Sequence, residues 1–80
     1  MQEYKTTDIY LVTALVVSGI ELKEVKKAGY SQAEFVLSGY DITDLVMQFQ
    51  NRTLKADAMT LFETHKSLKA RASDILRNQY

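Results

Sequence analysis

A chain of 80 residues with no cysteine and no proline is long enough for one small domain, residues 1–80, and cannot use disulfides or thiolate metal sites. The lack of cysteine favours a reducing, cytoplasmic setting, and the zero net charge argues against indiscriminate nucleic-acid binding, which normally draws on a basic excess. The charge is uneven, however, because residues 1–50 carry four Lys and seven acidic residues whereas residues 51–80 carry six Lys or Arg and three acidic residues.

The chain opens with a short mixed segment, in which residues 3–6 suit an edge strand, and continues into its most apolar run. From Ile9 to Val17 only Thr13 is plainly polar. A membrane span needs about 20 apolar residues, roughly twice this length. Glu3 and Asp8 precede the run, where a signal peptide has a positively charged start. We therefore expect a buried element of a cytoplasmic domain and no membrane association.

Helix is the favoured conformation for residues 9–18. Their β-branched content would suit a strand. Thr6, Thr7 or Asp8 can cap a helix at its start. Gly19 can take the left-handed conformation at its end, with Ile20 folding back onto Leu15 or Val16. Apolar residues surround this helix on almost every side, so nearly all of its surface should be covered.

Residues 20–27 and 33–37 predict two strands of an antiparallel hairpin, with a glycine-containing turn between them. The alternation that begins at Ile20 and Leu22 slips at Val25, which indicates a bulge or an early strand end. The second strand places three apolar residues on one face: Ala33, Phe35 and Leu37. Residues 3–6 could complete a three-stranded sheet.

Two helices follow the hairpin. Asp41 is a candidate cap for a helix over 42–51, with an apolar stripe at Ile42, Leu45, Val46 and Phe49. Asp57 is a candidate cap for a longer helix from Ala58 to about Asn78, and one sector of it gathers Ala58, Leu61, Phe62, His65, Leu68, Ala72, Ile75 and Leu76. We expect the C-terminal half of this helix to extend beyond the body and meet a partner.

The predicted fold is therefore α+β, with the order β-α-β-β-α-α. A small antiparallel sheet packs against the buried first helix, and the two remaining helices, the last one long, close the core.

Short motifs along the chain resemble those of a known family. The opening motif is Tyr4-Lys5-Thr6-Thr7-Asp8-Ile9-Tyr10-Leu11 followed by Gly19-Ile20, and the later motif is Lys55-Ala56-Asp57-Ala58 followed by Phe62 and Leu68-Lys69. They resemble an uncharacterised family of small bacterial and phage proteins that carry a domain of unknown function. Members differ in a more aromatic second strand, and some have proline at the position of Ala58. The resemblance implies an α+β fold and often a phage or mobile-element setting, and it implies no activity.

Catalytic and metal-binding chemistry finds little support in the sequence. His65 is the one histidine, and its position among apolar residues favours a packed, hydrogen-bonded structural role. Asp8, Asp41 and Asp57 each precede a helix and are explained as caps. No phosphate-binding loop and no nucleophile motif is present. We expect no enzymatic activity, no cofactor and no metal site.

Basic residues in the second half offer one possible function. Arg52, Lys55, Lys66 and Arg77 could contact the phosphates of a nucleic acid. Acidic residues interrupt this surface, and mixed charges are usual on a solvated helix face, so the nucleic-acid role is the alternative hypothesis.

Protein interaction is the leading hypothesis. The chain holds five tyrosines, a residue type enriched at interfaces. The candidate partner contacts are Tyr30, Tyr40, Met47, Ile75 and Leu76. We expect a small intracellular interaction module, homodimeric through the last helix or bound to another protein, in a phage-related setting. A small-ligand site at the hairpin tyrosines is the weakest hypothesis.

Overall fold

The computed structural model describes residues 1–29 and 31–77. Its elements are β1 (Gln2–Thr6), α1 (Ile9–Val17), β2 (Glu21–Lys27), β3 (Ala33–Gly39), α2 (Ile42–Gln50) and α3 (Ala58–Arg77). Their order confirms the predicted α+β arrangement β-α-β-β-α-α, and each starts or ends close to its predicted bounds. The predicted last helical residue, Asn78, lies outside the described residues.

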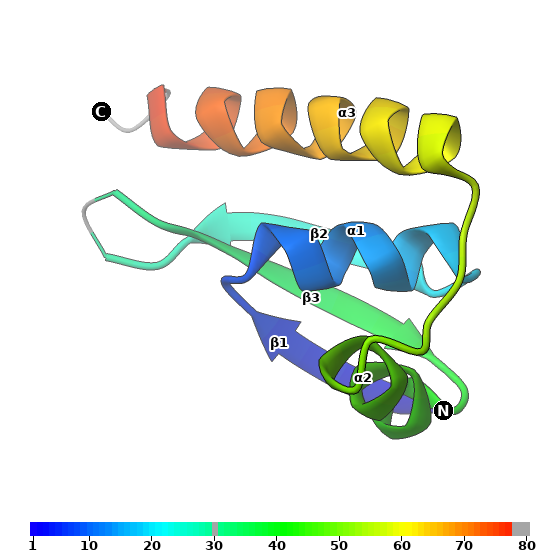
Figure 1. Ribbon diagram of the computed structural model, residues 1–80. Helices are drawn as coiled ribbons and strands as arrows, with labels where there is room; N and C mark the ends of the chain where they lie inside the picture. The colour runs from blue at the N-terminus through cyan, green and yellow to red at the C-terminus, as the bar shows by residue number, and fades with distance from the viewer. Residues whose placement is uncertain (30, 78–80) are drawn as a thin grey trace.

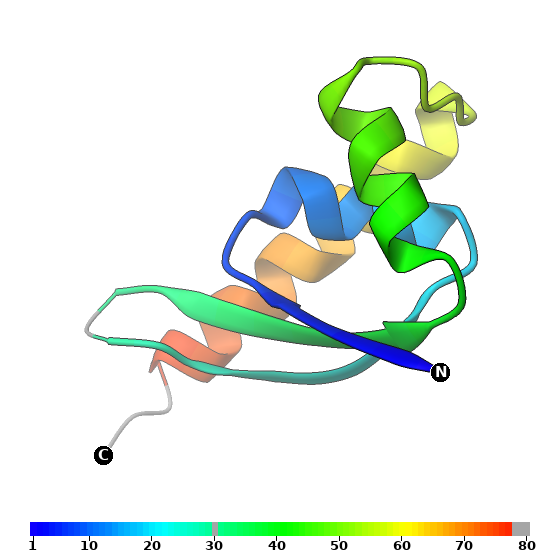
Figure 2. The same cartoon turned by 90° about the horizontal axis from the view of Figure 1, so that it is seen from below.

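The sheet has three strands in the order β1-β3-β2, and both neighbouring pairs are antiparallel. Figures 1 and 2 show α1 and α3 on the same side of this sheet, so that the fold has two layers. The predicted slip in β2 is confirmed, because the register shifts between Leu22 and Glu24. This bulge lets Leu22 pair with Leu37 and Val25 pair with Phe35 on the strand that fills the core.

Helix α1 lies at the centre of the core, as its all-round apolarity predicts. Its residues from Leu11 to Leu15 are all buried, including the polar Thr13, whose hydroxyl donates to the carbonyl of Ile9. The sheet, α2 and α3 cover it. Tyr10 is the exception, since 67% of its surface is exposed.

Both ends of α1 follow the prediction. The Asp8 carboxylate accepts from the backbone N–H groups of Tyr10 and Leu11. At the other end Gly19 has a φ of 101°, and the N–H of Ile20 donates to the carbonyl of Leu15. With the bond from Gly19 to the Val16 carbonyl, this is the Schellman arrangement, in which a residue of positive φ ends a helix.

The predicted cap of α2 is wrong. Asp41 has a φ of 60°, and its side chain makes no capping hydrogen bond. The oxygen Oε1 of Gln2 instead accepts from the N–H of Ile42 at 2.8 Å and from that of Thr43 at 3.4 Å. A side chain from β1 therefore caps a helix forty positions later, which a local motif search does not find.

Helix α3 crosses above α1 and the sheet, and contacts α1, β2 and β3. Leu68 is its buried anchor, while Ala72 and Ile75 are partly buried against the core. Its C-terminal half therefore packs on the domain, and the prediction that this half extends beyond the body is wrong. Among the described residues, no helix is both long and apolar enough to cross a membrane.

A candidate binding pocket between α1 and α3

An apolar pocket of about 570 Å³ opens beside α1, between the segment after α2 and the first half of α3. Its volume falls in the range of about 300–1,000 Å³ that is typical of ligand sites. The described lining residues come from α1, from α2 and the segment after it, and from α3: Tyr10, Thr13 and Ala14; Phe49, Arg52, Leu54 and Ala56; and Leu61, Phe62 and His65.

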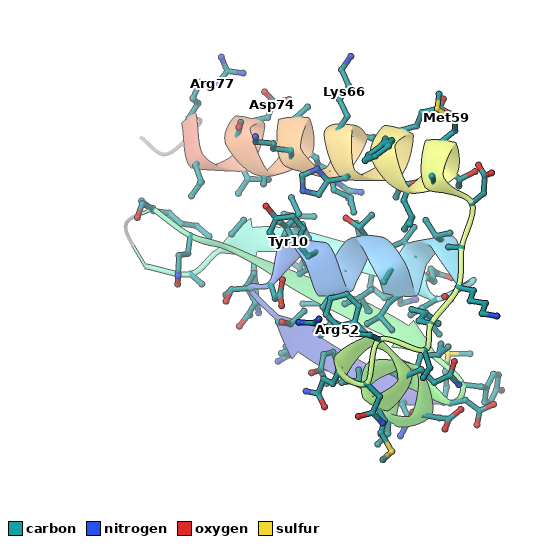
Figure 3. The ribbon with its side chains drawn as sticks, in the orientation of Figure 1. Tyr10, Arg52, Met59, Lys66, Asp74 and Arg77 are labelled. Carbon is teal, nitrogen blue, oxygen red and sulfur yellow. The ribbon has the colours of Figure 1, made fainter. Side chains whose placement is uncertain are left out.

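Two exposed aromatic side chains, Tyr10 and Phe62, line this pocket. Tyr10 extends into the space between α1 and α3 (Figure 3) and is 67% exposed, and Phe62 is 70% exposed. Phe62 belongs to the apolar sector of α3 predicted from the sequence, yet it does not pack into the core. On α3 the buried or half-buried side chains include those of Leu61, His65 and Leu68, and Phe62 lies about 100° further round the helix from Leu61.

His65 lies on the pocket wall with an unusual combination of contacts. Its ring stacks on that of Tyr10, with 5.1 Å between the ring centroids and 15° between their planes. Its Nε2 atom is buried and has no hydrogen-bond partner in the part of the chain that the structure describes. The predicted packing of His65 is confirmed, but the prediction that its side chain is hydrogen-bonded is wrong for Nε2. A buried nitrogen without a partner costs about 1–3 kcal/mol.

Arg52 supplies the charge at the pocket, and its backbone is strained. It follows α2 with a φ of 60°. The N–H of Arg52 donates to the carbonyl of Phe49, and that of Thr53 donates to Gln48. This is the same helix-ending arrangement that Gly19 makes after α1, with arginine where glycine is favoured. Within the described residues its guanidinium has no acidic partner.

The start of α3 is fixed by Asp57, as predicted. Its carboxylate accepts from the backbone N–H and the hydroxyl of Thr60, each at 2.9 Å. These hydrogen bonds hold the pKa of Asp57 below its ordinary value. The cap thus defines where the α3 wall of the pocket begins.

The four basic residues proposed for nucleic-acid contact do not converge on one surface. Arg52 lines the pocket, whereas Lys66 and Arg77 point outward from α3, away from α1 and the sheet (Figure 3). Arg77 also pairs with Asp74 at 2.7 Å. Lys55 is exposed on the segment between α2 and α3.

The residues proposed to contact a partner do not lie on one surface either. Tyr40 and Met47 are 69% and 54% exposed, and both line a second hollow of about 510 Å³ beside the N-terminus. Ile75 and Leu76 are half-buried near the other end of the molecule. Tyr30 lies outside the described residues.

Sequence reasoning missed the pocket. Three aromatic residues line it: Tyr10, Phe62 and His65. The helical pattern places each of them on an apolar helix face, and such a face is expected to be buried. The signal that could have marked the site is the arginine after α2, because a glycine or asparagine is usual there.

Comparison with known proteins gives one family and no individual relative. A model of the family described as "Domain of unknown function (DUF5659)" matches residues 1–73. No curated protein and no solved structure matches the chain. Among the described residues, no three His, Asp or Glu side chains lie close enough to hold a metal ion together.

Proposed function

The chain belongs to this family of unknown function, whose description assigns no activity, and we propose that the domain is a non-catalytic protein-interaction module that binds through the pocket between α1 and α3. The occupant is a bulky apolar side chain from a segment of a partner protein. This proposal places the binding surface at the start of α3, and not at its C-terminal end.

One observation carries the proposal: two large aromatic side chains stand mostly exposed beside an apolar pocket. Burying such surface would contribute about 25 cal/mol per Å² of apolar area, so leaving it open has a cost in the free domain that a partner would remove. Aromatic anchors that fill pockets contribute most of the binding energy in many interfaces. The exposed fractions of Tyr10 and Phe62 suit this role.

Selection from a displayed random-peptide library tests the proposal. The library is screened against the immobilised domain and against a Phe62→Lys variant. We expect the enriched peptides to share an aromatic or large aliphatic residue and to bind Phe62→Lys at least about tenfold more weakly, the effect of removing one anchor.

Met59→Lys is the matched control. Met59 is 64% exposed on the same helix but points away from α1 (Figure 3), so its substitution should leave peptide binding unchanged. The proposal is wrong if no peptide is enriched, or if the enriched peptides bind both variants equally well.

Analytical ultracentrifugation of the free domain distinguishes the kind of partner. We expect a monomer at high micromolar concentration. Self-association that Phe62→Lys abolishes would instead identify a second copy of this chain as the occupant.

A further inference from the structure

Strand β1 has one edge without a partner strand in the described part of the chain. The strand order is β1-β3-β2, so β1 pairs with β3 on one side only. Seen from below, β1 lies in front of β3, and no other described element crosses it (Figure 2). We propose that this edge pairs antiparallel with the same edge of a second copy of the chain, centred on Tyr4, so that two three-stranded sheets become one of six strands. This contact is independent of the pocket between α1 and α3.

The two edges of the sheet differ in how well they suit pairing. The edge strand β2 is irregular, because its register with β3 shifts between Leu22 and Glu24. Bulges and lysines are the features by which proteins prevent edge-to-edge pairing, and β2 also carries three lysines: Lys23, Lys26 and Lys27. In contrast, β1 keeps an unbroken register with β3 from Gln2 to Thr6. The backbone of β1 is therefore regular enough to pair along its whole length.

The charges of β1 complement themselves in the register centred on Tyr4. In that register Glu3 of each copy lies opposite Lys5 of the other, and side chains directly opposite each other share a face of the sheet. Pairing centred on Glu3 or on Lys5 would instead place like charges opposite each other, which is unfavourable. Both side chains are exposed, and within the described residues neither makes an ion pair. Pairing between two copies gives each of them a partner of opposite charge.

The contact between two β1 strands is small, so it is weak. Strand β1 has five residues, whereas a stable interface uses about 20–30 residues on each side. Ion pairs that remain exposed to solvent add little to its strength. We therefore expect the free domain to be monomeric at high micromolar concentration and to pair at millimolar concentration. A partner that holds two copies close together would supply an effective concentration in that range.

An NMR concentration series of the 15N-labelled domain, recorded at low ionic strength, tests the pairing. From micromolar to low millimolar concentration, the backbone amide signals of Gln2 to Thr6 should shift, and those of other exposed surfaces should not. Glu3→Lys and Lys5→Glu should each weaken the association at least about fivefold, because two attractive pairs become repulsive. In an equimolar mixture of these two variants every facing pair is again opposite in charge, so the association should return to that of the unaltered domain.

Lys66→Glu is the matched control, because it makes the same change of charge on the outward side of α3 (Figure 3) and should leave the association unchanged. Absence of shifts in residues 2–6, or a mixture that associates no better than either variant alone, would overturn the proposal. If one variant fails to fold, the double variant Glu3→Lys/Lys5→Glu decides, since it restores opposite charges between copies and must associate like the unaltered domain. Shifts confined to the pocket and abolished by Phe62→Lys would place the second copy there and overturn pairing through β1. Failure of β1 to pair leaves the proposed function standing.

Discussion

Replacing Arg52 with glycine should stabilise the free domain, although it removes a large side chain. The residue adopts a φ of 60°, a conformation that costs a residue with a side chain about 1–2 kcal/mol relative to glycine. Glycine also gains freedom in the unfolded chain, which offsets about 0.4–1 kcal/mol of that relief. The net gain in the free energy of unfolding is then about 0.5–1 kcal/mol.

Gly19 provides the reciprocal experiment in the same molecule. A Cβ atom added there would meet nothing within 4 Å, so Gly19→Ala changes the backbone preference without creating a clash. It should therefore destabilise the domain by about the amount that Arg52→Gly stabilises it, roughly 0.5–1 kcal/mol. Together the two substitutions compare the backbone strain of arginine at the end of α2 with the unstrained glycine at the end of α1.

Thermal and urea unfolding, followed by circular dichroism at 222 nm, measure both effects. For a domain of this length a change of 1 kcal/mol shifts the melting temperature by about 4–8 °C, so opposite shifts of roughly 2–8 °C are expected. If Arg52→Gly lowered the melting temperature, the side chain of Arg52 would stabilise the fold by more than its backbone strain costs, and the reasoning from strain would be wrong.

Three further substitutions test the surroundings of the pocket and the core. His65→Phe removes the buried nitrogen, whose burial costs about 1–3 kcal/mol, and keeps a ring facing Tyr10, so the melting temperature should rise; a fall would contradict the absence of a partner for Nε2. Leu15→Ala, at a fully buried position, should lower the free energy of unfolding by about 2–5 kcal/mol in urea titration, and a loss below about 1 kcal/mol would contradict its central place. Asp57 has a lowered pKa in the folded state, so its stabilising effect is complete above its ordinary pKa of 3.8 and is lost as the pH falls through the folded value. The difference in urea midpoint between the unaltered domain and Asp57→Asn should therefore shrink between pH 7 and pH 2, and a constant difference would refute this linkage.

Sequence reasoning succeeded where a structural feature depends on neighbouring residues. The caps at Asp8 and Asp57 and the helix end at Gly19 each involve hydrogen bonds within a few residues, so their residue types reveal them. The slip at Val25 likewise appears in the alternation of β2 itself. These local signals were enough to predict the order and approximate bounds of all six elements.

It failed where contacts join distant parts of the chain. Asp41 was predicted to cap α2 because its residue type suits a cap, but Gln2 from β1 occupies that role. A helical pattern places Phe62 in the apolar sector of α3, but it does not tell which part of that sector faces α1. The pocket lies where α1, α3 and the segment after α2 meet, so its existence could not be predicted from the periodicity of one helix.

The strand order has a consequence for how the domain forms. Strands β1 and β2 do not pair with each other, and both pair with β3, which is the last of the three strands in the sequence. Residues 1–32 can therefore form α1 but no part of the sheet. The backbone N–H and C=O groups of β1 and β2 have no strand to pair with until β3 is available. The β2–β3 ladder closes over the short connection between Lys27 and Ala33, whereas the β1–β3 ladder joins residues far apart in the sequence, which slows folding relative to local contacts. No part of the sheet can form before β3 is available, and a substitution that weakens β3 therefore weakens both strand pairs together.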